Sequence, residues 1–174
     1  MRIELANLEK GNGDFAQVYQ PDELDLGDER ASLCSPASIS GKIRHGGTEL
    51  FIDGNIDSCV QVDCDRCLRP LQLPVKSDFS LEYITGSEYE ANQTAELTEE
   101  LMSVSVFDGQ TIDIDEIAKE QILLQVPTRS LCKVDCKGFC PTCGADRNAG
   151  ECGCSGGQID PRWAALKDLM SGKS

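Results

Sequence analysis

The 174-residue chain has a single histidine, only 5% aromatic residues and no long apolar segment. The lone His45 excludes most nucleophile–base arrangements that depend on histidine. No glycine-rich loop carries the lysine and the following helix of a phosphate-binding loop. We therefore expect no enzymatic activity. The longest apolar run covers about five residues around Ile122 to Val126, far short of the roughly 20 residues that span a membrane.

The first residues, Met1 to Leu5, lack a basic stretch followed by an apolar one, so we expect no secretory signal and a cytoplasmic protein. This expectation bears on the ten cysteines, because cytosolic thiols are mostly kept reduced. A disulfide scaffold is therefore disfavoured, and metal binding or redox chemistry is favoured.

Basic residues are few, since 16 Lys and Arg stand against 30 Asp and Glu, a net charge of −14. The excess lies in residues 1–126, with a net charge of −16, whereas residues 127–174 carry +2. Phosphate neutralisation supplies most of the non-specific affinity for nucleic acids, so the acidic body should repel RNA. If RNA is a partner, the contact is local or runs through a basic protein. Otherwise the acidity only keeps the protein from associating.

Alternating apolar and polar residues predict antiparallel strands between residues 37 and 84. A turn is expected at His45-Gly46-Gly47, after which two strands of about thirteen residues form a long hairpin with residues 64–70 at its tip. Gly54 interrupts the apolar face and predicts a bulge or bend. An early strand is expected over Met1 to Leu5. The apolar positions of the hairpin are Leu50, Ile52, Ile56, Val60, Val62, Leu71, Leu73, Val75, Phe79, Leu81 and Tyr83.

After the hairpin we expect a mobile acidic loop over residues 85–100, followed by alternation at Met102, Val104 and Val106. A helix then begins at Asp113, which caps it together with Glu116, and ends at Pro127. Its predicted apolar side consists of Ile114, Ile117, Ala118, Ile122 and Leu124.

Six cysteines lie within 23 residues of the tail, in a segment otherwise rich in Lys, Gly, Asp, Asn and Pro. Such a segment has almost no side chains for a core, and four thiolates around a zinc ion can fold it. In the piece Cys140-Pro-Thr-Cys143-Gly the spacing lets both sulfurs reach one tetrahedral ion. Two of the other four tail cysteines complete the site, and the sequence does not indicate which two. The six predicted metal ligands are Cys132, Cys136, Cys140, Cys143, Cys152 and Cys154.

A second pair with this spacing, Cys64 and Cys67, lies at the tip of the predicted hairpin. It can supply half of a zinc site, and with the six tail cysteines it makes eight, the number needed for two four-thiolate sites. The pair can equally be a vicinal dithiol, or two residues that only take part in a turn. A thioredoxin-like role is disfavoured, because it needs a helix N-terminus and the surrounding pattern is strand and turn. Cys34 and Cys59 have no partner at ligand spacing and are expected to be ordinary small residues.

A last helix is expected near the C-terminus, with Asp160 as its cap and Pro161 at its first position. Trp163, Leu166 and Met170 fall on one side of it. This side either docks on the rest of the chain or binds a partner.

Three segments resemble the YceD family of bacteria and plastids. They are the sequence VDCDRCL from Val62, the capped helix ended by Pro127, and the cysteine-rich tail through the DPRWAAL sequence from Asp160. The resemblance covers roughly residues 37–170. Arg147-Asn148 stands where the family often has Leu-Asn, a departure that should not affect the metal. The resemblance implies a role in the accumulation of large-subunit ribosomal RNA, without a known catalytic activity.

These observations predict an α+β protein with a predominantly antiparallel sheet, one packed helix and a zinc-held loop followed by a helix. Residues 1–126 form an acidic body, and residues 127–174 a cysteine-rich appendage. We expect a non-enzymatic ribosome-biogenesis factor that contacts the ribosomal precursor, through large-subunit rRNA or a basic ribosomal protein. The alternative is a redox or metal-responsive protein using Cys64 and Cys67. The basic residues expected at the contact are Arg66, Arg69, Lys133 and Lys137.

Overall fold

The computed structural model describes residues 1–9, 11–92 and 104–154. The chain forms two compact units. Unit 1 contains Met1–Asp63 and Pro70–Ser130, and unit 2 contains Cys64–Arg69 together with Leu131–Ser174, of which residues 131–154 are described. The predicted division at residue 126 stays a prediction. Among the described residues, no helix is both long and apolar enough to cross a membrane.

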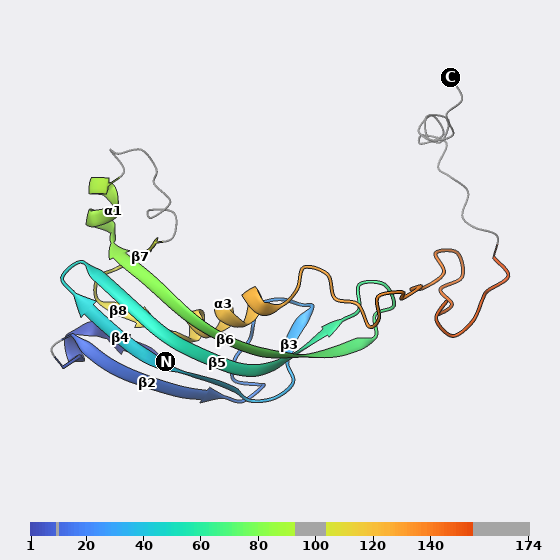
Figure 1. Ribbon diagram of the computed structural model, residues 1–174, viewed down its shortest axis with the longest axis horizontal. Helices are drawn as coiled ribbons and strands as arrows, with labels where there is room; N and C mark the ends of the chain where they lie inside the picture. The colour runs from blue at the N-terminus through green and yellow to red at the C-terminus, as the bar shows by residue number, and fades with distance from the viewer. Residues whose placement is uncertain (10, 93–103, 155–174) are drawn as a thin grey trace, which may run out of the picture. The chain divides into compact units, whose positions relative to one another are not determined.

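Unit 1 is built on a mainly antiparallel sheet of six strands in its described part (Figure 1). The main path runs β2–β4–β5–β6–β7, with β3 beside β5, and only β7 pairs in parallel, with β6. Strands β1 and β8 form a separate antiparallel pair. The predicted α+β class is thus confirmed. The strands are β1 (Arg2–Glu4), β2 (Asn12–Tyr19), β3 (Ala31–Leu33), β4 (Ala37–Gly46), β5 (Glu49–Asp63), β6 (Pro70–Thr85), β7 (Val104–Phe107) and β8 (Thr111–Asp113), and a 3₁₀ turn η1 covers Leu5–Asn7.

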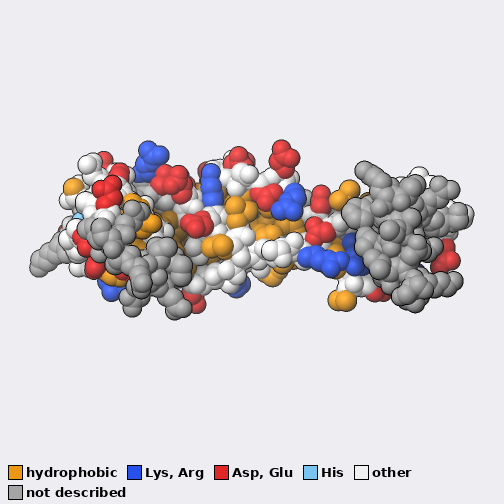
Figure 2. Space-filling model, turned by 90° about the horizontal axis from the view of Figure 1, so that it is seen from above, with side chains coloured by type: hydrophobic (Ala, Val, Ile, Leu, Met, Phe, Trp, Pro, Cys, Tyr) orange, Lys and Arg blue, Asp and Glu red, His pale blue; other side chains and the backbone are white. Residues whose placement is uncertain are grey.

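The long hairpin is confirmed as β5 and β6, whose pairing runs without interruption from Glu49–Ile84 to Asp63–Pro70. Every second residue of β5 faces the core, and Leu50, Ile52 and Val60 are fully buried there. The opposite parity carries polar side chains that form ion pairs across the strands, such as Arg44–Asp53 and Lys76–Asp57. Figure 2 shows basic side chains interspersed with acidic ones on the face drawn there.

Of the bulge or bend predicted at Gly54, the bulge is wrong, because the pairing of β5 with both neighbours continues through this residue. Gly54 instead lies in a cross-strand row formed by Phe15, Gly41, Gly54 and Phe79. A Cβ atom at Gly54 would lie 2.6 Å from the Phe79 ring and 2.8 Å from the Ser40 carbonyl oxygen. The two glycines therefore leave space for the flanking aromatic rings, which are both buried.

We expect Gly54→Ala to lower the free energy of unfolding by about 1–3 kcal/mol, because its Cβ overpacks a site bounded by backbone. Gly46→Ala is the matched control, since a Cβ there meets nothing within 4 Å. Urea denaturation of both variants measures the difference. Equal urea midpoints for the two variants would show that the sheet accommodates a Cβ atom at Gly54 without loss of stability.

The predicted helix is confirmed as α3 (Ile114–Gln125), which contacts β5 and β6. The Asp113 side chain accepts a hydrogen bond from the Asp115 backbone N–H and so caps the first turn. One assignment on its apolar side is wrong, because Leu124 is 66% exposed and Gln121 is buried instead. Residue 121 falls on the stripe of a 3.6-residue period, and residue 124 does not. The buried residues are Ile114, Ile117, Ala118, Gln121 and Ile122.

Two predictions between the hairpin and α3 need correction. The predicted loop over 85–100 contains a helix, α1 (Gly86–Asn92), and its remainder lies outside the described residues. In β7 the parity is reversed, since Val106 is half exposed and Phe107 is buried. Phe107 meets the rings of Tyr83 and His45 edge to face, which holds it on the inner side. Met102 and the predicted C-terminal helix also lie outside the described residues.

The assignment of Cys34 and Cys59 as ordinary small residues is wrong, because the structure joins them in a disulfide with a Cα separation of 5.4 Å. Cys34 directly follows β3, and its backbone N–H donates to the Cys59 carbonyl in β5. Their 25-residue separation carried no signal in the sequence. The bond ties the short strand β3 to β5.

Candidate metal centres

The tip of the hairpin forms a tight cysteine turn. The Leu68 N–H donates to the Cys64 carbonyl, and the Cys64 N–H donates to the Arg69 carbonyl, both at 2.9 Å. Leu68 has a φ of 51°, in the left-handed region. This backbone brings the Cys64 and Cys67 side chains to the same side of the turn, where both are buried.

A second turn with the same hydrogen bonds surrounds Cys140 and Cys143. The Gly144 N–H donates to the Cys140 carbonyl and the Cys140 N–H to the Ala145 carbonyl, again at 2.9 Å. Gly144 takes a φ of 73°. The two turns are therefore equivalent position by position, with glycine in the second where the first has leucine.

Each turn is completed by two further cysteines, so that unit 2 contains two groups of four sulfur atoms. Within each group all four lie within 4.8 Å of one another, a spacing that could hold a metal ion. The structure thus pairs the two turns with different tail cysteines, a choice that the sequence left open. The first cysteine cluster is Cys64, Cys67, Cys132 and Cys136, and the second is Cys140, Cys143, Cys152 and Cys154.

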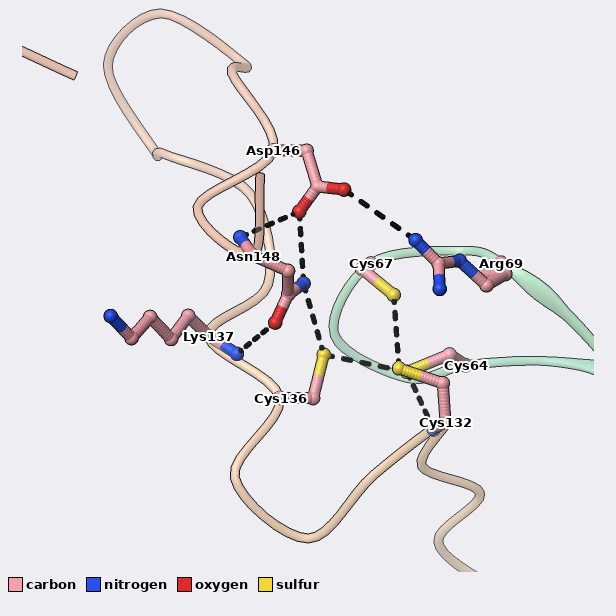
Figure 3. Close-up of polar contacts among 8 residues, drawn as sticks. All are labelled: Cys64, Cys67, Arg69, Cys132, Cys136, Lys137, Asp146 and Asn148. Carbon is pink, nitrogen blue, oxygen red and sulfur yellow. Dashed lines mark hydrogen bonds and ion pairs between the residues drawn. The ribbon is translucent and has the colours of Figure 1, made fainter. Parts of the chain in front are cut away.

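Polar contacts fix the first cysteine cluster (Figure 3). The Cys132 backbone N–H and the Asn148 side-chain amide donate to the sulfurs of Cys64 and Cys136, each at 3.4 Å. The Asn148 oxygen accepts from the Lys137 backbone N–H at 2.8 Å, so the amide is oriented from both ends. The sequence offered no signal for this role of Asn148, which depends on the fold of the intervening loop.

The four thiols of a cluster do not share one ionisation behaviour. Burial opposes the charged form of Cys64, but the N–H groups of Cys132, Arg66 and Cys67 outweigh it and lower the pKa of Cys64. Burial and the neighbouring sulfurs raise the pKa of Cys132. Similarly, backbone N–H groups lower the pKa of Cys140, and the Cys143 sulfur raises that of Cys154. A cation would be needed for all four thiols of a cluster to be ionised together.

All four basic residues expected at a partner contact lie in unit 2, but they differ in their surroundings. The Arg66 guanidinium donates to the Cys136 carbonyl, and Arg69 lies 3.9 Å from the Asp146 carboxylate. The side chains of Lys133 and Lys137 are exposed. Arg66 thus contacts the backbone at the first cysteine cluster, whereas Arg69 is 62% exposed and the side chains of both lysines are exposed.

The family model described as "Large ribosomal RNA subunit accumulation protein YceD" matches residues 52–170, which include both cysteine clusters. The chain belongs to the YceD family. The family name implies a role in the accumulation of large-subunit ribosomal RNA. No solved structure matches the chain.

Relatives of this YceD protein occur in bacteria and a plant. An uncharacterized protein of Mycobacterium tuberculosis, Rv2926c, is 32% identical over 180 residues, covering all of this chain and 83% of the relative. The uncharacterized protein YlbN of Bacillus subtilis is 26% identical, covering 96% of this chain and 93% of the relative. The large ribosomal RNA subunit accumulation protein YCED homolog 1, chloroplastic, of Zea mays is 23% identical over a region that covers 66% of this chain and 46% of the relative.

Proposed function

We propose that this YceD protein is a non-enzymatic ribosome-biogenesis factor that promotes the accumulation and processing of large-subunit ribosomal RNA in the cytoplasm. The observation that carries the proposal is the family match over residues 52–170, which covers β6, β7, most of β5, α3 and both cysteine clusters. No membrane or small-molecule substrate is involved. The protein works by binding a ribosomal precursor.

The metal in each cluster is zinc. Four sulfurs at about 2.3 Å from one tetrahedral ion lie roughly 3.8 Å from one another. In the first cysteine cluster the sulfurs of Cys64 and Cys136 are 3.9 Å apart, and those of Cys67 and Cys132 are 3.6 Å apart. A set of four thiolates with no oxygen ligand also favours zinc over magnesium or calcium.

The composition of unit 2 supports a structural role for zinc. In its described part, the buried hydrophobic side chains are cysteines only, namely Cys64, Cys67, Cys136 and Cys140. None of them belongs to the apolar core of unit 1. The free energy that folds unit 2 therefore comes from metal ligation rather than from apolar burial.

Unit 2 also supplies the contact with the precursor, through rRNA or a basic ribosomal protein. Counted from the complete sequence, unit 1 has a net charge of −16 and unit 2 a net charge of +2 before metal binding. Two four-thiolate zinc sites at −2 each bring unit 2 to about −2, so the contact depends on individual basic side chains and not on the net charge of the unit. The residues that we propose at the contact are Arg66, Arg69, Lys133 and Lys137, and the side chains of the two lysines are exposed.

Association of the tagged full-length protein with large-subunit precursors tests the proposed function. Gradient sedimentation of a cell extract should place it with precursor particles, and deletion of its gene should lower the amount of large-subunit rRNA relative to small-subunit rRNA. If the tagged protein remains at the top of the gradient, and if the deletion strain has an unchanged ratio of large- to small-subunit rRNA, these two results together contradict the proposal.

We expect Asn148→Ala to weaken zinc binding at the first cysteine cluster about 10- to 100-fold, since its amide donates to the Cys136 sulfur. Competition with a chromogenic chelator measures the affinity. The exposed Asn55, which lies in unit 1, serves as the control in Asn55→Ala. If both variants hold zinc as tightly as wild type, Asn148 does not support the site.

The rival function is a redox or metal response through Cys64 and Cys67. A titration of reactive thiols distinguishes it from a structural zinc site. Tightly bound zinc leaves few reactive thiols in native protein, whereas a redox pair reacts readily. Titration of native thiols before and after denaturation in chelator separates the two. Fast reaction of Cys64 and Cys67 in the zinc-loaded protein would favour the rival.

A further inference from the structure

Phe139 stands apart from the other aromatic side chains. It is 41% exposed, whereas the other described Phe, Tyr and His rings are buried or half-buried. It also lies in unit 2, between the exposed Lys137 and the second cysteine turn. An exposed ring next to basic side chains is the composition of a base-stacking site.

Backbone hydrogen bonds hold the main chain at Phe139 in place. The Phe139 N–H donates to the Arg66 carbonyl at 3.2 Å, and Phe139 forms a β-bridge with Asp146. The preceding Gly138 accepts from the Arg147 N–H at 2.9 Å and has a φ of 64°. A Cβ at Gly138 would lie 2.6 Å from the Arg66 carbonyl oxygen, so glycine is needed for this close approach. A main chain fixed in this way loses little conformational entropy when a base stacks on the Phe139 ring.

Leu68 gives a second indication that this part of unit 2 contacts a partner. It lies two residues after Arg66, whose carbonyl binds the Phe139 N–H. Leucine in the left-handed region costs about 1–2 kcal/mol, and the equivalent position of the second turn is Gly144. The Leu68 side chain is 64% exposed, so burial within the chain does not offset this cost. A strained, exposed apolar residue points to a contact outside the chain.

We propose that Phe139 and Leu68 form a site for an unpaired base of single-stranded RNA, with Lys137 and Arg147 beside the adjacent phosphates. This inference rests on the proposed function and names the part of the precursor that unit 2 recognises. Each four-thiolate zinc site carries a charge of −2, so two filled sites take the charge of the whole chain further below −14. Long-range attraction of RNA is therefore unfavourable, and stacking supplies the affinity. A contact with so few phosphates has a shallow salt dependence.

The test measures binding of the zinc-loaded full chain to a fluorescent, unstructured oligoribonucleotide of about 12 nucleotides, within the range of typical single-strand sites. We expect Phe139→Ala to weaken binding about tenfold, Phe139→Trp to restore it, and Phe139→Leu to stay near the alanine variant. Leu68→Gly should also weaken binding while leaving thermal stability unchanged or raised. Phe51→Leu and Leu124→Ala in unit 1 are controls, since Leu124 matches Leu68 in exposure.

Each other outcome has a defined meaning. Wild-type binding by Phe139→Leu would overturn stacking, and a loss of stability in Leu68→Gly would show that its side chain works within the chain. Equal affinity for a duplex RNA, or no affinity for the oligoribonucleotide, would overturn the inference even if the protein sediments with precursors. Conversely, oligoribonucleotide binding by a protein that never meets precursors would contradict the proposed function alone.

Discussion

Cys67→Ser is expected to reduce bound zinc from two ions per chain to one, and Cys143→Ser is expected to do the same through the other cluster. Each substitution leaves three thiolates, and a structural zinc site needs four protein ligands. Because unit 2 has no apolar core in its described part, loss of an ion should unfold the loops around that cluster. Unit 1 should keep its β signal in circular dichroism, since its core is separate.

Elemental analysis of protein purified without chelator measures the zinc content. Cys59→Ser is the control, because Cys59 lies in the disulfide with Cys34 and outside both clusters, and it should keep two ions. Less than about half an equivalent of zinc in wild type would contradict metal binding altogether. Loss of the β signal in Cys67→Ser or Cys143→Ser would instead show that the two units depend on each other for folding.

Charge reversal of two lysines should have the second large effect. We expect the double variant Lys133→Glu, Lys137→Glu to lose association with large-subunit precursors at least tenfold, because both side chains are exposed on the unit that we propose as the contact. Arg66 and Arg69 are left intact, since Arg66 binds the Cys136 carbonyl and Arg69 lies beside Asp146. Their replacement would disturb the cysteine clusters as well as the contact.

The control is the double variant Lys42→Glu, Lys76→Glu, which changes the net charge by the same amount but in unit 1. Co-sedimentation at two salt concentrations compares the two double variants. The competing view is that acidity alone recruits a basic ribosomal protein. It predicts little loss from the lysine variant and a large loss from neutralising Glu96, Glu99 and Glu100, which lie outside the described residues. That pattern would remove Lys133 and Lys137 from the contact.

The sequence by itself determined the parts of this protein that depend on local periodicity and spacing. Alternation located the β5–β6 hairpin, because side chains of a strand point to opposite faces in turn. The Asp113 cap and Pro127 located α3 to within a residue or two. The spacing of Cys140 and Cys143 predicted a turn whose cysteines could hold a metal ion, and three segments, among them the motif around Cys64 and Cys67, indicated the family.

Weak periodicity explains what the sequence missed in unit 1. Strand β2 was not predicted because its inward positions alternate bulky Phe15 and Tyr19 with Gly13 and Gln17, so the apolar repeat is diluted. Gly54 gave the same signal as a bulge, although its role is to make room for the Phe79 ring. Such a role depends on which residues pair across three strands, and register is set by the whole sheet.

Only the tertiary structure decided the contacts between residues distant in sequence. It divided eight cysteines into two clusters of four, joined Cys34 to Cys59, and placed the Asn148 amide against the Cys136 sulfur. Residues 64 and 136 are 72 positions apart, so no local spacing relates them. The same applies to the exposure of Phe139, because whether a side chain is covered depends on every element that packs around it.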